Sequence, residues 1–407
     1  MAMEKNKMLW LNFLHIYQPP TLEKELLVKI TKEAYFNIVR ILKEHPKYKI
    51  TLNISGCLTE YLFQVGNTKL IADIKSLVKK GQIELTGSAA FHPLLPLLPV
   101  REIAKQITIN NDINKNYFGS VYKPKGFYLP EMAYSDEVAK VIKKLGFKWI
   151  ILDEIALDGK INNGHVDYTK KYKIRHIGLN VVFRNRKVSK TFVPETIEQL
   201  LLSGKRPEVV ISATDGELYG HKYEDHSKVL QKILKNKELE TATISEFLAQ
   251  KREEITTELK KSTWESTPAE LTNKIPYSLW QHPKNNIHKR LWQLANFALQ
   301  LNYSSTKDPN HFASRLHLEK GLASCTFWWA SDKDFKMFND PAWSPGEVEK
   351  GALELLRSIR ALFKIDYKDK IKAEKMFLEI HKEIWTKHWS KFKKPDKNLI
   401  EKILGIK

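Results

Sequence analysis

Acidic side chains follow several short apolar stretches of this chain, at the points where buried strands are expected to end. The plainest example is Glu131, which comes directly after the apolar residues 126–129 and Pro130. Comparable positions, inside an expected strand or just beyond its end, are taken by His15, Gln18, Glu84, His92, Asp153, Glu154, Asp215 and Glu217. Because parallel strands bring their carboxyl ends to one rim, we expect such side chains to meet there.

Two carboxyl groups at one rim are the equipment for cleaving a glycosidic bond. One acts as nucleophile or base and the other as acid. Histidine and glutamine can bind sugar hydroxyls, and some of the ten tryptophans could stack on pyranose rings. Taken singly, each candidate has an ordinary explanation as a core histidine, a helix cap or a core-filling indole. Together they favour an active site, because burying several carboxylates at one rim is costly.

Alternating strand and helix patterns must position these residues. Strands are expected at residues 8–14, 49–54, 83–86, 126–129, 149–152 and 208–213. Amphipathic stretches between them predict helices at residues 22–44, 70–80, 100–117 and 135–145. Six or seven right-handed parallel units predict an α/β fold with a closed or nearly closed barrel. Residues 172–192, which include Arg184 and Arg186, are interpreted as an inserted hairpin.

The pattern changes in the last third of the chain. Long helices are expected at residues 286–301, 311–323, 345–363 and 372–388. We therefore predict a catalytic barrel domain over residues 1–260 and a helical C-terminal region, packed on it, over residues 261–407.

The charge and the cysteine content narrow the class of protein. The formal net charge is +20, but the lysines are scattered and arginine is scarce, which disfavours a nucleic-acid binder. Two cysteines, Cys57 and Cys325, fit a reducing compartment. With neither a secretion signal nor an apolar run long enough to span a bilayer, we expect a soluble cytoplasmic protein without a membrane partner.

Four motifs resemble a known enzyme family. They are HIYQPP (residues 15–20), GQIELTGSAAFHPLLP (81–96), GFYLPEMAYS (126–135) and ISATDGELYG (211–220). In order and spacing they are similar to the first four sequence regions of the family 57 glycoside hydrolases. The resemblance implies an incomplete TIM-like (β/α)7 barrel. It also implies a retaining mechanism on α-glucans, in an α-amylase, 4-α-glucanotransferase, amylopullulanase or branching enzyme.

The resemblance also implies roles for individual residues. It makes Glu131 the nucleophile and Asp215 the acid/base, with Glu217 as a supporting acid. His15 and Glu84 match residues that bind sugar in the −1 subsite. Gln18 and His92 lie within the matched motifs and are candidates for further substrate contacts.

Local chemistry is consistent with these roles. Pro130 has no N–H for a neighbouring strand, so it ends the ladder and directs Glu131 toward the barrel mouth. A helix beginning near Ser135 would bring its positive end close to that carboxylate. For a retaining pathway we predict that the Glu131 and Asp215 carboxyls lie roughly 5–6 Å apart, whereas a separation of roughly 9 Å would contradict it.

A fifth motif, GLASCTFWWASD (residues 321–332), resembles the aromatic run of the amylopullulanase branch. Trp328 and Trp329 are expected to be stacking platforms for sugar. An acidic residue usually precedes these aromatics, where this chain has residues 324–326, Ser-Cys-Thr. Asp332 and Asp334 are the candidates to replace it.

Three alternatives stay open. A metal-dependent polysaccharide deacetylase would need an Asp beside a His-x-x-x-His pair, whereas His221 and His226 are five residues apart. A non-catalytic glycan-binding protein would have no use for both acids, and a nucleic-acid binder is disfavoured by charge. We predict an oligo- or polysaccharide α-glucan as substrate, and neither a metal nor an organic cofactor. Hydrolysis against transfer, chain-length specificity and oligomeric state stay open.

Overall fold

The computed structural model describes residues 7–162, 164–331 and 342–390. The chain divides into two compact units, Met1–Tyr277 and Ser278–Lys407, which are described separately. Their division falls later than residue 260, where the sequence placed the domain boundary. Within the first unit, the backbone N–H of Trp264 donates to the carbonyl of Glu131 at 3.0 Å, which ties the segment after residue 260 to the strands.

Seven parallel strands form the centre of the first unit. In spatial order they are β8 (Val209–Asp215), β1 (Met8–Ile16), β2 (Ile50–Ile54), β3 (Ile83–Leu85), β4 (Gly126–Tyr128), β5 (Trp149–Asp153) and β7 (Asn180–Arg184). A parallel bridge between Gly87 and Phe127 joins β3 to β4. The last seam, between β7 and β8, includes a 2.8 Å bond from Asn185 N to Ile211 O. The predicted (β/α)7 barrel is confirmed.

The predicted inserted hairpin is only half right. β6 (Lys171–Ile174) and β7 do form an antiparallel pair. However, β7 also runs parallel to β5 along its whole length, so it is a strand of the barrel and not an insertion. β10 (Glu254–Thr257) extends this sheet beside β6, and β9 (Leu239–Thr241) pairs with the first residues of β1. A hairpin pattern alone does not show which strand continues the barrel.

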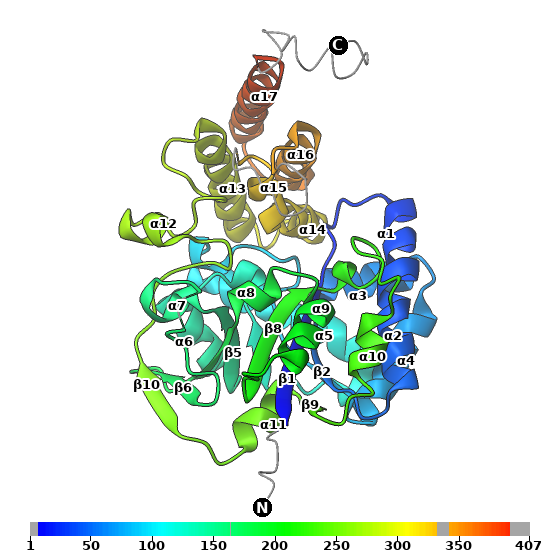
Figure 1. Ribbon diagram of the computed structural model, residues 1–407. Helices are drawn as coiled ribbons and strands as arrows, with labels where there is room; N and C mark the ends of the chain where they lie inside the picture. The colour runs from blue at the N-terminus through cyan, green and yellow to red at the C-terminus, as the bar shows by residue number, and fades with distance from the viewer. Residues whose placement is uncertain (1–6, 163, 332–341, 391–407) are drawn as a thin grey trace, which may run out of the picture. The chain divides into compact units, whose positions relative to one another are not determined.

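Helices surround the strands of the first unit, as Figure 1 shows. They are α1 (Lys24–Ile30), α2 (Phe36–Glu44), α3 (Gly56–Gln64), α4 (Thr68–Lys79), α5 (Val100–Phe118), α6 (Asp136–Lys144), α7 (Ile155–Asp158), α8 (Arg186–Ser189), α9 (Val193–Leu202), α10 (Val229–Ile233), α11 (Ile244–Ala249) and α12 (Pro268–Thr272). A π-helical turn, Thr31–Tyr35, joins α1 to α2. Such turns occur often at functional sites, and this one carries Tyr35.

The strands are apolar on both sides because helices cover their outer face and side chains fill the barrel. All residues of β2, β4 and β5 are buried. Close packing also explains a glycine: a Cβ on Gly126 would lie 2.0 Å from the ring of Trp149. The strand that leads to Glu131 therefore begins at a position that only glycine fits.

The second unit is a helical bundle. It contains α13 (Asn286–Ser304), α14 (His311–Gly321), α15 (Ser324–Trp328), α16 (Pro345–Ala361) and α17 (Tyr367–Ser390). Leu291, Leu318, Leu355 and Ile380 are fully buried in its core. The helical C-terminal region predicted from the 3.6-residue pattern is thus present.

Candidate active site

Glu131 lies in a strained turn immediately after β4. Its backbone has φ 60° and ψ 16°, and Met132 follows with φ 48°. Two successive non-glycine residues in the left-handed region are costly, and such strain is concentrated at functional sites. The turn is held by bonds from Met132 N to Leu129 O at 2.7 Å and from Ala133 N to Pro130 O at 3.0 Å. Pro130 thus ends the strand as expected, but the left-handed backbone also sets the direction of the Glu131 side chain.

The side chains of Trp264 and His92 lie beside the Glu131 carboxylate. The indole Nε1 of Trp264 donates to Oε2 at 2.9 Å, and Nδ1 of His92 lies 3.6 Å from Oε1. The Glu131 side chain is 12% exposed, against 2% for His92, so Glu131 is the more accessible of these two. Ser135 caps α6 by accepting from Val138 N, which confirms a helix start just beyond the turn.

Asp215 and His15 lie side by side on two neighbouring parallel strands. They are register partners at the ends of β8 and β1. His15 Nδ1 lies 2.8 Å from Oδ1 of Asn53, whose Nδ2 donates to Thr86 at 3.1 Å. This chain of bonds makes His15 Nδ1 the donor and leaves Nε2 as an acceptor. Burial lowers the pKa of His15, although Asp215 and Asn53 oppose the shift, so the ring is neutral near pH 7.

Stacked rings connect the two carboxylates. His15 packs on Tyr128 with ring centroids 4.4 Å apart and on His92 at 4.9 Å, and Tyr17 covers His92 at 4.0 Å. Burial raises the pKa of the Tyr128 hydroxyl, and the negative charges of Glu131 and then Asp215 raise it further. The stack joins His15, the register partner of Asp215, to His92, whose Nδ1 lies 3.6 Å from Glu131. Burial and the neighbouring His15 hold the pKa of His92 well below its usual value.

Glu217 lies two residues after Asp215 and is buried, and two side chains donate hydrogen bonds to its carboxyl group. Gln18 Nε2 donates to its Oε1 at 2.8 Å, and the Tyr35 hydroxyl donates to the same oxygen. Burial, followed by the charge of Asp215, raises the pKa of Glu217 to about 7. Gln18 bonds both Glu217 and Tyr35, and its predicted contact with substrate stays a prediction. Glu217 therefore holds a proton for about half of the time at pH 7.

Comparisons with known proteins agree with this geometry. The glycosyl hydrolase family 57 model matches residues 5–260. The chain belongs to this family. An α-amylase from Pyrococcus horikoshii is 29% identical over 140 residues, a match that covers 34% of this chain and 22% of that enzyme. The matched segment therefore covers less than a quarter of that relative's length.

Solved family 57 structures share the fold. A 4-α-glucanotransferase from Thermococcus litoralis superposes with a TM-score of 0.67 at 18% identity, covering 88% of this chain and 60% of that one. A family 57 branching enzyme from Thermococcus kodakaraensis gives a TM-score of 0.66 at 16% identity, covering 91% of this chain and 94% of that one. These similarities establish the family 57 architecture.

Glu84 is not brought together with the other acids. Ser245 N, at 3.0 Å, and the Ser245 hydroxyl both donate to its carboxylate. Ser245 lies on α11, just after the strand that pairs with the first residues of β1. Glu84 pairs with Thr51 on β2, and Thr51 in turn pairs with Phe13 on β1. Glu84 therefore lies two residues before the level of His15. The structure thus places it toward the N-terminal half of the family 57 barrel, where it binds α11.

Asp153, also an acid at a strand end, forms ion pairs with two arginines. Arg184 Nε lies 2.7 Å from one carboxylate oxygen and Arg186 Nη2 lies 2.6 Å from the other. All three side chains are buried, and burial of Asp153 is outweighed by the two guanidinium groups, so its pKa is lowered. Glu154 is likewise occupied by Asn162 N at 2.7 Å and the Tyr168 hydroxyl at 2.7 Å. Neither acid is available for chemistry on a substrate.

Trp328 and Trp329 belong to the second unit. Trp328 ends α15, and Trp329 donates its backbone N–H to Cys325 O at 3.0 Å. Both are half-buried, and their predicted role as stacking platforms stays a prediction. Asp332 and Asp334, the candidate acids of the fifth motif, lie outside the described residues.

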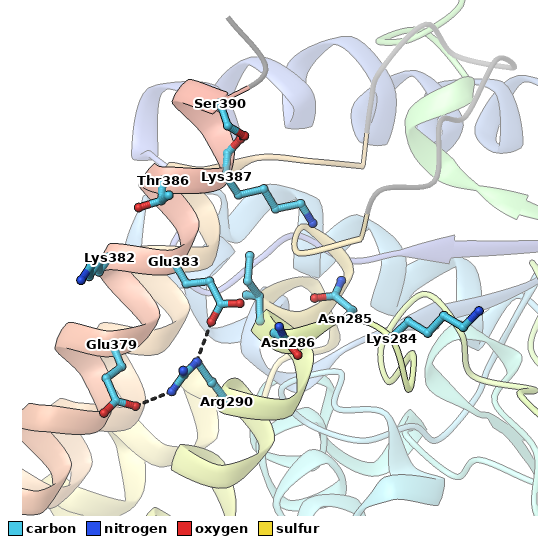
Figure 2. A pocket seen from close by; sticks show the side chains of 11 residues that line it. Lys284, Asn285, Asn286, Arg290, Glu379, Lys382, Glu383, Thr386, Lys387 and Ser390 are labelled. Carbon is cyan, nitrogen blue, oxygen red and sulfur yellow. Dashed lines mark hydrogen bonds and ion pairs between the residues drawn. The ribbon is translucent and has the colours of Figure 1, made fainter. Parts of the chain in front are cut away.

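A separate hollow of about 690 Å³ lies between α13 and α17 (Figure 2). Arg290 crosses it to bond Glu379 and, at 2.6 Å, Glu383. None of the residues predicted for the active site lines it. In the ranges that the structure describes, no three His, Cys, Asp or Glu side chains are grouped to hold a metal ion. No helix in these ranges is long and apolar enough to cross a membrane.

Proposed function

We propose that this family 57 chain is a retaining glycoside hydrolase or transglycosylase that acts on α-1,4-linked gluco-oligosaccharides. The observation that carries the proposal is the stacked pair His15 and His92, with ring centroids 4.9 Å apart. His15 is the register partner of Asp215 at the end of β8, and His92 Nδ1 lies 3.6 Å from Glu131, which follows β4. Two carboxyls around one rim position are what a retaining glycosidase requires. The named activities of the relatives, α-amylase and 4-α-glucanotransferase, support the substrate class.

In the first step, a Glu131 carboxylate oxygen attacks the anomeric carbon. The glycosidic C–O bond breaks, and Asp215 gives its proton to the departing oxygen. In the second step Asp215, now ionised, removes a proton from water or from an acceptor hydroxyl. That oxygen attacks the same carbon and releases Glu131, so the two inversions give net retention.

The surrounding residues have roles that follow from their contacts. The Trp264 N–H binds Oε2 of Glu131, which keeps the other oxygen, Oε1, on the side that faces His92. His15 Nε2 is free to accept from a sugar hydroxyl because its Nδ1 donates to Asn53. Glu217, held by Gln18 and Tyr35, places a carboxyl group with a proton behind Asp215. These are roles in ordering the site and binding the sugar.

Hydrolysis and transfer differ only in the acceptor of the second step, and both stay within the proposal. The proposal also includes a separation of roughly 5–6 Å between the Glu131 and Asp215 carboxyls. It further includes contacts with sugar by His92, Trp328 and Trp329. A cytoplasmic location is also a prediction. The contacts of His221 do not support the alternative of a metal-dependent deacetylase, because this imidazole is bonded to Glu33 at 2.6 Å.

The test is to incubate wild type, Glu131→Ala and Glu258→Ala with maltoheptaose and to resolve products by chain length. Glu258 is the matched control because its side chain is 74% exposed and makes a loose ion pair with Arg175. We expect product formation by wild type and Glu258→Ala and none by Glu131→Ala. Longer and shorter products together would indicate a glucanotransferase, and shorter ones alone a hydrolase. An inactive wild type, or an active Glu131→Ala, would contradict the proposal.

A further inference from the structure

Arg184 has all three sides of its guanidinium group bonded. It is the last residue of β7, and its register partner on β5 is Asp153. Nε donates to Asp153 at 2.7 Å, Nη1 donates to Ala213 O at 3.0 Å, and Nη2 donates to Trp264 O at 3.2 Å. Arg186 donates to the second carboxylate oxygen of Asp153. The carboxylate that accepts from Arg184 is therefore itself held in place.

Two of these bonds reach the segments that carry the proposed catalytic acids. Ala213 lies on β8, two residues before Asp215. Trp264 is bonded to Glu131 twice, through its backbone N–H at 3.0 Å and its indole N–H at 2.9 Å. One guanidinium group therefore links the strand that bears Asp215 to the residue that holds Glu131.

The same group also orients the indole. The carbon centre of the Arg184 guanidinium lies 5.1 Å from the centroid of the Trp264 ring, within the range of a cation–π contact. The Trp264 ring meets His15 and Tyr128 edge-on, with centroids 6.2 and 6.3 Å away. With these contacts on its ring, the indole directs its N–H toward Glu131.

A purely structural role would not need this geometry. Asp153 could be neutralised by Arg186, and a buried ion pair as such adds little net stability. A planar fork with three fixed directions is what distinguishes arginine from lysine, which carries a point charge. The bonds to Ala213 and Trp264 also lie at the β7–β8 edge, where the barrel closes.

We infer that Arg184 is a positioning residue that sets the separation of Glu131 and Asp215 and directs the Trp264 indole at the nucleophile. The inference rests on the proposed function, since it takes these two acids as the catalytic pair. The separation of the two carboxyls decides between the retaining and inverting mechanisms, and a misplacement of about 1 Å can cost about 10²-fold in rate. Arg184 and its partner Trp264 both lie outside the four family motifs.

The test compares Arg184→Lys with the matched control Arg175→Lys. Arg175 lies between β6 and β7, is 53% exposed and approaches Glu258 only to 3.8 Å. With an aryl α-glucoside or maltoheptaose, well below the unfolding temperature, we expect kcat of Arg184→Lys to fall by about 10- to 100-fold with KM within about threefold. The control should match wild type. An unchanged kcat, or a change in KM alone, would overturn the inference.

A second readout needs no substrate. The indole ¹H–¹⁵N resonance of Trp264, assigned by its absence in Trp264→Phe, should move in Arg184→Lys and stay in place in Arg175→Lys. An unmoved resonance would overturn the positioning role even if activity fell. If instead wild type proves inactive on α-glucans while the resonance moves, the contact is supported and the failure belongs to the proposed function.

Trp264→Phe keeps an aromatic side chain and the backbone N–H but removes the indole donor, so it covers the case in which Arg184→Lys does not fold. We expect kcat to fall by about 10²-fold, as for other single donors to a reacting oxygen. The acid limb of the kcat/KM profile should also move to higher pH, because the ionised nucleophile loses a hydrogen bond. An unchanged acid limb would overturn the assignment of this N–H to Glu131.

Discussion

The indole nitrogen of Trp264 lies 2.9 Å from Oε2 of Glu131, although the two residues are 133 positions apart in the chain. The backbone groups of the same two residues form a second bond at 3.0 Å. These two bonds attach the strained turn after β4 to the segment around Trp264, which follows the last barrel strand in the chain. The direction of the proposed nucleophile therefore depends on tertiary contacts as well as on its own turn.

Strain at Glu131 predicts a difference between two inactive variants. Glu131→Gly accepts the left-handed backbone without a steric penalty, whereas Glu131→Ala retains it. We expect Glu131→Gly to be more stable than Glu131→Ala by about 1 kcal/mol, a steric gain reduced by the greater freedom of glycine in the unfolded chain. Urea unfolding of both variants measures this. If Glu131→Ala is the more stable, the turn is not strained as described.

Glu217 predicts a stability that falls as the pH rises. Its pKa is about 7 in the fold against 4.5 unperturbed, so between these values the folded chain holds a proton that the unfolded chain has lost. The contribution of Glu217 to the unfolding free energy should therefore decrease between pH 4.5 and 7, by up to ~3 kcal/mol, and level off above. Glu217→Gln should remove this slope. Parallel stability profiles for wild type and Glu217→Gln from pH 5 to 8 would contradict the account.

The buried imidazoles predict the opposite trend on the acid side. The pKa values of His15 and His92 are lowered, chiefly by burial, so below pH 6.5 the unfolded chain binds protons that the folded chain does not. Stability contributed in this way is lost as the pH falls from 6.5 toward 5. His92→Phe, which retains a ring between Tyr17 and His15, should flatten this loss. Thermal unfolding at several pH values tests it, and an equally steep acid loss in the variant would refute it.

Glu84 and Asp215 should behave differently when made neutral. Asp215→Asn removes the proposed proton donor, so we expect kcat on maltoheptaose to fall by about 10³-fold or more. Glu84→Gln weakens the bonds to Ser245 at α11 and should mainly lower stability, by about 1–3 kcal/mol, with kcat changed less than about threefold. Comparing kcat with the urea midpoint separates the two effects. A catalytic loss in Glu84→Gln as large as that in Asp215→Asn would instead support its −1 subsite role.

Much of the site could be predicted from the sequence because it depends on local signals. Short apolar runs gave the strands, and residues at their ends reached one rim, as His15 and Asp215 show. Glu84 broke the rule because it lies within its strand, paired with Thr51, and not beyond the end. The position of an acid along its strand therefore set its level in the barrel: Asp215 pairs with His15, whereas Glu84 pairs with Thr51, the partner of Phe13.

The remaining parts depend on contacts that no local pattern records. Arg184 and Arg186 were visible as a pair but were assigned to an insertion, since strand pairing between β5 and β7 is a long-range property. Tyr35 lies on a π-helical turn and reaches Glu217 across 182 positions. Trp264 was one indole among ten, and only the fold identifies its partner.

The measurement that tests the central claim most directly is the site of covalent attachment during turnover. The wild-type protein is incubated with a fluorinated α-glucosyl fluoride, which forms a glycosyl-enzyme that hydrolyses slowly, and its peptides are mapped by mass spectrometry. The account predicts one glucosyl adduct, on Glu131 in the peptide that spans residues 126–135, and none in Glu131→Ala. An adduct on Asp215 or Glu217, or turnover of the reagent by Glu131→Ala, would contradict it.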